Sequence, residues 1–419
     1  MASSTAVEEV DANTPLQEVA RRLGVSLILH GTLQGAGDRI AVTVRLEDME
    51  SGKSLWAKSY SGMVQDLLTL QDQIYDELLS VLEVTPSLSE RARVITHSTE
   101  NSEAYDLYLR GRNALRGRQD VKNVQTALHL FQEALQKDSS FALAYVGVAD
   151  ASLAMFDETR SGSWTQRAVA AGEQARSLNP NLPEVFFALG SVYRITGKEA
   201  EAVSVLKQAI ELAPNSDEGY RRLGSTLASA GRNREAIEAY RKAVELNPYY
   251  WLNFSSLGGA YYQIGEYDQA LEAYRKVVEL EPDNAWGHLN IGAMLLGQGK
   301  YEESIPAFQR ALEIKASWDA YSNLGTAYFF LHRYPEAVTA FEKAVELGPN
   351  RQMLVGNLAD AYRWSGQTEK ARQAYDRAIE LAFGELKINP RNADALASLA
   401  LYYAKKGDTA EAQIGRAHV

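Results

Sequence analysis

The chain has 419 residues, a formal net charge of −11 and a sequence pI of about 5.2. This length exceeds one ordinary hydrophobic core, so we expect several units or a repeat array. The acidic balance argues against nucleic acid as the main partner, because a phosphate-binding face is usually basic. Without cysteine, the sequence offers no disulfide, thiolate metal site or cysteine nucleophile, and it leaves the cellular compartment open.

Residues 1–95 predict a small α/β domain that begins with a helix. Thr14-Pro15-Leu16-Gln17 has the order of an N-cap, a first-turn proline and a capping-box glutamine, and the helix should end at Gly24. We expect strands over 26–33 and 40–46, joined by a glycine-rich turn that indicates a hairpin.

Alternation in the second strand places four apolar side chains on one face of the sheet: Ile40, Val42, Val44 and Leu46. A third strand is expected around 55–60. A helix with an apolar face should follow over about 65–82.

This order of elements resembles the TolB-type N-terminal domain that precedes repeat arrays in large bacterial proteins. The resemblance is carried by Ala20-Arg21-Arg22-Leu23-Gly24-Val25, His30-Gly31-Thr32-Leu33, Gly37-Asp38-Arg39-Ile40, Ser54-Leu55-Trp56-Ala57 and Leu70-Gln71-Asp72-Gln73-Ile74. It implies an additional strand and helix upstream, so we expect a partial domain and a reading frame longer than the one given. It also implies that related proteins carry a kinase, a cyclase or a DNA-binding domain there.

Three ladders of glycine and proline recur every 34 residues through the middle of the chain. They are Gly190, Gly224, Gly258 and Gly292; Gly197, Gly231, Gly265 and Gly299; and Pro180, Pro214, Pro248 and Pro282. The first glycine predicts a close approach between two helices, A and B, because it has no Cβ. The second predicts a left-handed turn after helix A, and the proline ends helix B.

These residues resemble the tetratricopeptide repeat family. Two ungapped units carry the signature: Tyr220, Leu223, Gly224, Gly231, Ala236, Tyr240, Ala243 and Pro248, then Phe254, Leu257, Gly258, Tyr261, Gly265, Ala270, Tyr274 and Pro282. The resemblance implies a mainly α fold over residues 104–413, a helix-hairpin superhelix of about eight and a half repeats that follows a linker at 96–103. Two A–B turns should be longer than usual, around 116–123 and 156–163, and the eighth repeat should have a long helix B reaching Pro390.

The last six residues, 414–419, stop inside a predicted helix B and read like a translated sequencing adapter. We expect a non-native tail there. A natural polar capping tail is the alternative.

No phosphate-binding loop, zinc-protease helix or nucleophile elbow occurs, and the six histidines are scattered. Glu245, Glu279 and Glu346 recur near the ends of helices B, as expected for a solvated repeat face. The sequence therefore predicts a protein that is not an enzyme and that has no cofactor or metal.

In the family, helix A lines a concave groove, and this implies a set of candidate binding residues. The sixth position of helix A carries Asn290, Asn323 and Asn357 in successive repeats, where amides suit the backbone of an extended peptide. Aromatic anchors are expected at Trp286, Phe329 and Trp364. The alternatives are that asparagine is simply common at this position and that Trp286 and the neighbouring Phe330 belong to the core.

Arg194, Arg221 and Arg222 form a second candidate, a basic patch for an acidic side chain or a C-terminal carboxylate. Chance clustering of surface arginines is the alternative. The leading hypothesis is a protein- or peptide-binding scaffold within a larger bacterial signalling protein, with small-molecule ligands disfavoured. The alternatives are the regulatory half of a kinase or cyclase, and a structural spacer.

Overall fold

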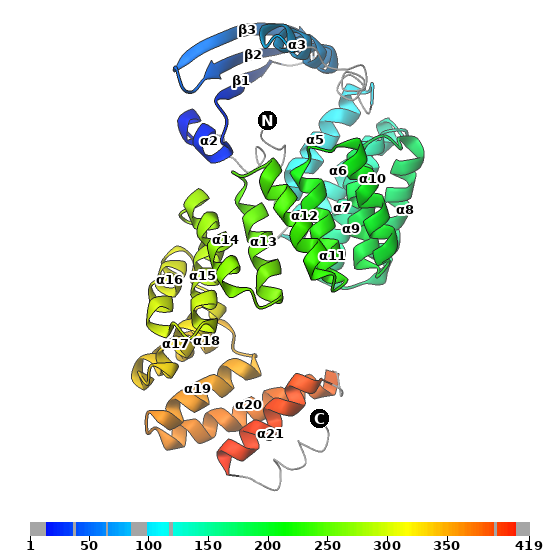
Figure 1. Cartoon of the computed structure of the whole chain (residues 1–419). Coiled ribbons are helices and arrows are strands. Elements are labelled where there is room, and N and C mark those ends of the chain that lie inside the picture. Colours follow the sequence, from blue (N-terminus) through cyan, green and yellow to red (C-terminus); the bar gives the residue numbers. More distant parts are fainter. Residues whose placement is uncertain are drawn as a thin grey trace. The chain divides into compact units, whose positions relative to one another are not determined.

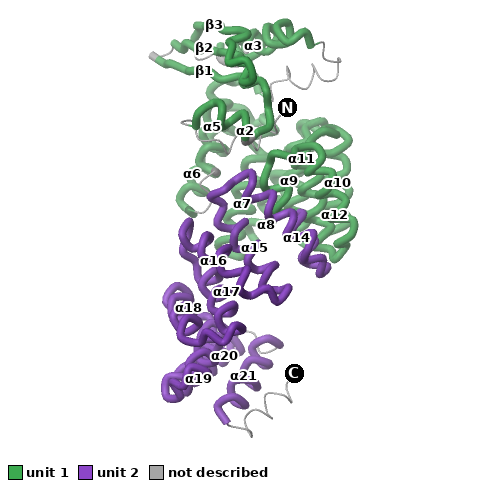
Figure 2. The backbone as a smooth tube through the Cα atoms, turned by 60° about the vertical axis from the view of Figure 1, so that its left-hand side comes forward, with its two compact units in different colours: residues 1–256 green, residues 257–419 purple. Residues whose placement is uncertain are grey.

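The computed structural model describes residues 14–36, 39–63, 66–84, 99–116, 120–388 and 392–407. Residues 96–98 of the predicted linker and the whole adapter-like tail lie outside these residues. Two compact units divide the chain, residues 1–256 and residues 257–419 (Figure 2). The fold class is the predicted one, mainly helical with a small sheet near the N-terminus (Figure 1).

The N-terminal elements are α2 (Leu16–Leu23), β1 (Leu27–Ala36), β2 (Arg39–Asp48), β3 (Lys53–Met63) and α3 (Leu67–Val81). The strands form an antiparallel sheet in the order β1-β2-β3. Gly24 takes φ +59°, so the first helix ends where the sequence predicts. Its start differs, because Pro15 rather than Thr14 is the N-cap and accepts the first bonds through its carbonyl oxygen.

One face of the sheet packs against α3, and Ile40, Val44, Tyr60 and Leu70 form its buried core. The predicted alternation in β2 is thus confirmed. The Tyr60 hydroxyl donates to Glu77 at 2.9 Å, and Lys58 pairs with the same carboxylate at 2.6 Å, which ties β3 to α3. Burial and the bond to Glu77 raise the pKa of Tyr60 to about 12.

Eight helical hairpins and the first helix of a ninth follow in the described part of the chain (Figure 1). Unit 1 holds α5 (Ser102–Arg116), α6 (Val121–Lys137), α7 (Ala142–Thr159), α8 (Gly162–Leu178), α9 (Pro183–Ile195), α10 (Glu199–Leu212), α11 (Asp217–Ser229) and α12 (Asn233–Leu246). Helix α13 (Trp251–Gln263) spans the division between the units. Unit 2 continues with α14 (Tyr267–Leu280), α15 (Ala285–Gly297), α16 (Tyr301–Ile314), α17 (Trp318–Phe330), α18 (Tyr334–Leu347), α19 (Gln352–Trp364), α20 (Thr368–Ile388) and α21 (Ala393–Lys406).

The packing role predicted for the first glycine ladder is confirmed. A Cβ built on Gly224 would lie 2.7 Å from the Tyr240 ring, and one on Gly292 would lie 2.5 Å from the Phe308 ring. Neither distance is compatible with a side chain, so helix B approaches as closely as it does only because the residue is glycine.

The turn ladder is also confirmed, since Gly265 takes φ +80° between α13 and α14. In the repeat of α17 and α18, His332 occupies the same place with φ +58°. A left-handed conformation is costly for a residue with a Cβ, so this repeat breaks its own pattern at that position.

The extra residues predicted for the second A–B turn lie in the helices instead. Helices α7 and α8 have 18 and 17 residues, whereas α11 and α12 have 13 and 14. Arg160, with φ +54°, caps α7 directly before α8 begins. Helix extension satisfies the backbone groups of inserted residues, which a long surface turn would leave to water. The long helix B of the eighth repeat is confirmed as α20, with 21 residues.

Within each unit, helices A of neighbouring repeats touch one another: α5, α7, α9 and α11 in unit 1, and α15, α17 and α19 in unit 2. Among the described elements, helices B of neighbouring repeats do not reach comparable contact. The A layer is therefore the tighter one, as expected for helices that line the inner, concave side of a repeat array.

Candidate functional site

The three candidate asparagines lie on successive A helices of unit 2. Asn290, Asn323 and Asn357 belong to α15, α17 and α19 and are half-buried. The Asn290 amide nitrogen donates to the Trp286 carbonyl oxygen at 2.8 Å, one turn back in its own helix. Among the described residues, no hydrogen bond is recorded for the amides of Asn323 and Asn357, so both remain open to a ligand.

The aromatic candidates differ in exposure. Trp286 and Trp364 are 54% and 60% exposed, whereas Phe329 is half-buried and packs against the core of α18–α20. Phe330, for which the sequence also allowed a core position, is 51% exposed. Trp286 and Phe330 are therefore surface residues, and the partly buried Phe329 lies beside Phe330.

Two tyrosines that sequence reasoning missed join Phe329, Phe330 and Trp364 into one cluster across three repeats. Tyr301 stacks on Phe330 with ring centroids 4.9 Å apart, and Tyr334 stacks on Trp364 at 5.7 Å. Phe329 lies between the two stacks, 6.1 Å from Phe330 and 5.5 Å from Tyr334. We call these five residues the aromatic cluster. Tyr301 and Tyr334 each follow a turn by two residues, a regular spacing that could have revealed them.

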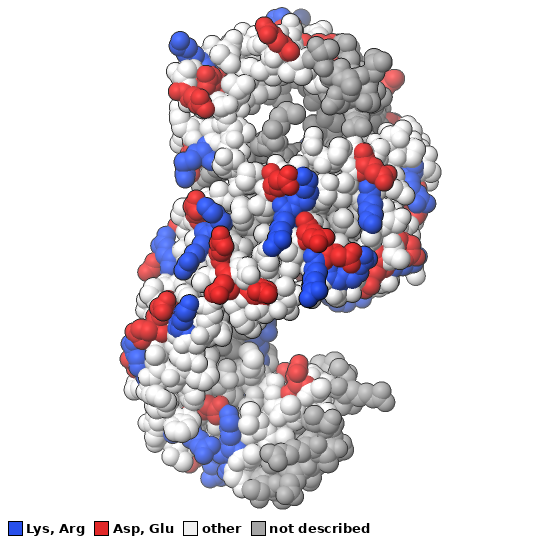
Figure 3. Space-filling model, viewed as in Figure 1, with Lys and Arg blue, Asp and Glu red and all other residues white. Residues whose placement is uncertain are grey.

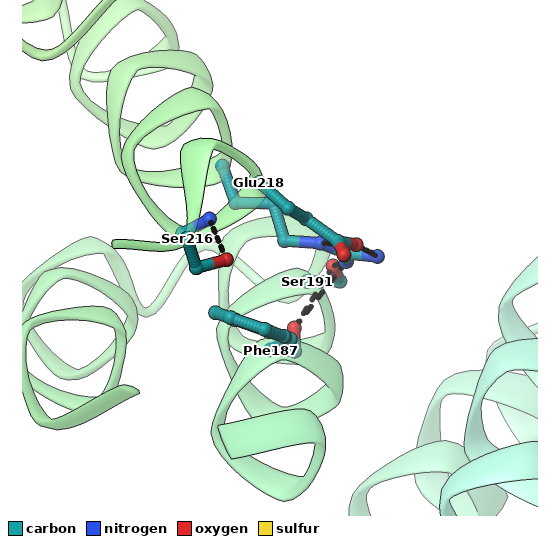
Figure 4. A network of polar contacts seen from close by, with 6 residues as sticks. Phe187, Ser191, Ser216 and Glu218 are labelled. Carbon is teal, nitrogen blue, oxygen red and sulfur yellow. Dashed lines mark hydrogen bonds and ion pairs between the residues drawn. The ribbon is translucent and has the colours of Figure 1, made fainter. Parts of the chain in front are cut away.

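The arginine candidates of unit 1 do not form one open basic patch, because Arg222 is bonded within the protein to Glu218 and Ser191, two residues labelled in Figure 4. Arg222 donates to the Glu218 carboxylate through Nε at 2.8 Å, and its Nη2 lies 2.7 Å from the same oxygen. Its Nη1 donates to the Ser191 hydroxyl at 2.7 Å, which links α11 to α9. The positive charge of Arg222 is therefore already neutralised within the protein.

Arg194 and Arg221 lie elsewhere on the same unit. The Arg221 guanidinium is 5.7 Å from the centre of the Tyr250 ring. Burial raises the pKa of Tyr240, and the Ser225 hydroxyl and the charges of Arg221 and Arg194 oppose that rise. Both arginines thus lie near the Tyr240 hydroxyl, and no ion pair is recorded for either one in the described part of the chain.

Charged residues that sequence reasoning did not select surround Arg222 on the A layer of unit 1. They are Arg112 on α5, Asp150 on α7 and Glu184 on α9. The charges of Arg112 and Asp150 act on Arg222, and those of Arg112 and Glu218 act on Glu184. Arg112, Asp150 and Glu184 all act on the nearby Tyr108. Burial among these atoms raises the pKa of Glu184, and the neighbouring Glu218 adds to the rise. Sequence reasoning could have found these residues, because they lie on the A helices of the first three repeats.

The B layer carries a different pattern of charge. Glu245, Glu279 and Glu346 are exposed and lie 2.7–2.8 Å from Lys242, Lys276 and Lys343, one turn earlier in each helix. Figure 3 shows such alternation of acidic and basic side chains on the viewed face. Exposed pairs of this kind stabilise little and belong to a solvated surface.

Within the residues that the structure describes, no group of three or more acidic or histidine side chains is placed to hold a metal ion. The same residues contain no helix long and apolar enough to cross a membrane.

Some curated relatives match parts of the chain. A putative adenylate cyclase 3 of Rhizobium meliloti is 26% identical over 148 residues, which is 35% of this chain and 25% of that protein. The Tol-Pal system protein TolB of Syntrophotalea carbinolica is 32% identical over 95 residues, 22% of each chain. The chain thus spans about a quarter of the length of these relatives. Among solved structures, a crystal structure of MamA is 31% identical, with a TM-score of 0.34, and covers 38% of this chain and 93% of its own.

Three family models match the helical hairpins. A TPR repeat model matches residues 258–299, and a tetratricopeptide repeat model matches 283–350. A further tetratricopeptide repeat model matches 187–250, 322–385 and 357–419. Together they cover more than half of the sequence, so the chain belongs to the tetratricopeptide repeat family.

Proposed function

We propose that the concave face of unit 2 binds an extended peptide segment of a partner protein. The observation that carries this proposal is the alignment of Asn290, Asn323 and Asn357 on three adjacent A helices, beside exposed aromatic rings. Neighbouring helix layers are spaced by roughly 10 Å. This distance corresponds to about three residues of extended chain, so successive asparagines would meet peptide units that are three residues apart.

The amides would supply affinity without sequence preference, because each offers one donor and one acceptor group to a peptide backbone. A typical contact of this kind contributes about 0.5–1.5 kcal/mol. Asn323 and Asn357 are ready to make it, whereas Asn290 would first exchange its bond to the Trp286 carbonyl oxygen.

Sequence preference would come from the rings. Trp286 and Trp364 offer exposed faces, and Phe329 forms the floor beside Trp364 and Tyr334. Truncating an aromatic anchor at the centre of an interface costs about 2 kcal/mol or more. We therefore expect the bound peptide to place apolar side chains at the aromatic cluster.

The test is selection of binders from a random peptide library, followed by measurement of their Kd for wild type and for the triple Asn→Ala variant. The variant should bind at least about tenfold more weakly, a difference of 1.4 kcal/mol. Gln309→Ala on α16, an exposed amide on the B layer, is the matched control and should bind like wild type. Equal binding by all three proteins would leave the asparagines as repeat consensus and refute the proposal.

Arg194 and Arg221 are proposed as separate binding residues within unit 1. Neither has an ion-pair partner among the described residues, so each would receive an acidic side chain or a C-terminal carboxylate. Arg222 is excluded from this role by its bonds to Glu218 and Ser191.

We further propose that the chain is a non-catalytic scaffold region of a larger bacterial signalling protein. Residues 1–95 would be a partial TolB-type domain, 96–103 a linker and 104–413 the repeat array. The similarity to TolB and the three-stranded sheet packed against α3 support this organisation. Removing residues 1–95 should leave peptide binding by unit 2 intact.

The alternative is that the chain is the regulatory half of an enzyme. The similarity to a putative adenylate cyclase supports this alternative. Sequencing the locus on both sides of the given reading frame distinguishes the two. A cyclase or kinase domain in the same frame would favour the regulatory role, and its absence would favour the scaffold.

A further inference from the structure

The A layer of unit 1 carries charges, and some occupy positions equivalent to those of an amide or a ring in unit 2. Arg222 corresponds to Asn290, and Glu184 and Glu218 correspond to Trp286. Each charge belongs to a helix that contacts the next in the order α5, α7, α9 and α11. The residues are Arg112, Asp150, Glu184, Glu218 and Arg222, which we call the charged groove. Two guanidinium groups thus face three carboxylates, and the surface holds one excess negative charge.

Bonds within the protein locate that excess. Arg222 is committed to Glu218, at 2.8 Å from its Nε, and to the Ser191 hydroxyl. No lysine or arginine is recorded within ion-pair distance of Glu184 in the described part of the chain, and the residue keeps surface open to solvent although neighbouring atoms partly surround its carboxylate. Burial raises the pKa of Glu184 and the neighbouring Glu218 adds to the rise, whereas the charge of Arg112 opposes it without forming an ion pair with Glu184 among the described residues.

We propose that the charged groove binds a basic segment of a partner protein, with a lysine or arginine side chain paired to Glu184. Charge complementarity selects this occupant, because the local excess is negative and the whole chain carries −11. An acidic segment would meet Glu184 and Glu218 without a free guanidinium at Arg222. The site is separate from the proposed peptide surface of unit 2.

The neighbouring residues suit such a side chain. The Arg222 guanidinium lies 5.7 Å from the centre of the Phe187 ring, and Phe187 belongs to the same helix as Glu184. The Phe187 ring is itself buried and helps to fix the position of Arg222, while the Glu184 carboxylate would receive the charged end of the partner side chain. Arg222 holds Glu218 in place, so little rearrangement is needed when the partner binds.

The experiment measures binding of fluorescein-labelled hexa-arginine and hexaglutamate to the full chain by fluorescence anisotropy. Wild type should prefer hexa-arginine. Glu184→Gln should weaken that binding at least about tenfold, because one charge-assisted contact is lost. Glu211→Gln, an exposed carboxylate on α10, removes the same charge from the B layer and should weaken it by no more than about twofold.

Two further variants guard the interpretation. Glu184→Lys should shift preference toward hexaglutamate, a gain that a folding defect does not produce. The triple variant of Asn290, Asn323 and Asn357 should bind hexa-arginine like wild type, which separates this site from that of unit 2. Equal losses for Glu184→Gln and Glu211→Gln would show only attraction to the overall charge and would overturn the proposal, as would wild-type preference for hexaglutamate.

Discussion

The two sets of repeats share one packing scheme but present different chemistry on their concave faces. Unit 1 carries charges that largely pair with one another, such as Arg222 with Glu218. Unit 2 carries neutral amides and the aromatic cluster, in which Tyr334 stacks on Trp364. Part of the difference lies at equivalent positions of helix A, such as Arg222 in unit 1 and Asn290 in unit 2.

Glycine positions show why this divergence is tolerated. Gly224 in unit 1 and Gly292 in unit 2 both admit a ring of helix B where a Cβ would lie less than 3 Å away. The A–B contact thus restricts the residues between the helices. It leaves the open face of helix A free to vary, so one packing scheme accommodates two different sets of surface groups.

The largest effect on stability is expected at the helix A glycines, a feature that the two units share. Gly224→Ala and Gly292→Ala should each lower the free energy of unfolding of the affected repeats by about 1–3 kcal/mol through overpacking. Gly384→Ala in α20 meets nothing within 4 Å and should instead stabilise by about 0.5–1 kcal/mol, since alanine favours a helix. Hydrogen exchange resolved by repeat measures all three, and comparable destabilisation by Gly384→Ala would contradict the role given to packing.

Peptide binding by the two units should differ in its dependence on salt concentration. Raising the salt concentration to about 1 M shortens the Debye length to about 3 Å. We expect binding of hexa-arginine to the charged groove to weaken at least about tenfold, and binding of a library peptide to unit 2 to change by less than about threefold. Anisotropy titrations at low and high salt measure both. Equal salt sensitivity would mean that the two faces do not differ in their recognition chemistry.

The smallest effect is expected at the turn of α17 and α18, where unit 2 departs from its own pattern. His332 takes φ +58°, and its Nδ1 lies 2.7 Å from the Tyr334 hydroxyl. His332→Gly should relieve backbone strain and stabilise the repeat by about 0.5 kcal/mol, because the gain is offset by a more flexible unfolded chain and a lost hydrogen bond. Thermal unfolding detects the change. Destabilisation beyond about 1 kcal/mol would show that the contact to Tyr334 outweighs the strain.

Sequence reasoning succeeded where one local requirement is repeated. Gly224 predicts a close contact between helices, Gly231 predicts a left-handed turn, and Pro248 predicts the end of a helix. Each residue has that role in the structure. Their spacing alone sets the register of the hairpins. The candidate binding residues followed from this register, but their partners did not.

The sequence by itself determined the repeat, its register and the faces of its helices, because these depend on backbone conformation and on contacts between neighbouring segments. Only the tertiary structure decided which side chains remain available. The Ser191 hydroxyl that holds Arg222 belongs to another helix, as does Trp364, against which Tyr334 stacks. It also placed the residues inserted near Arg160 in longer helices. Such outcomes depend on which groups from different repeats meet, and no pattern within one repeat contains that information.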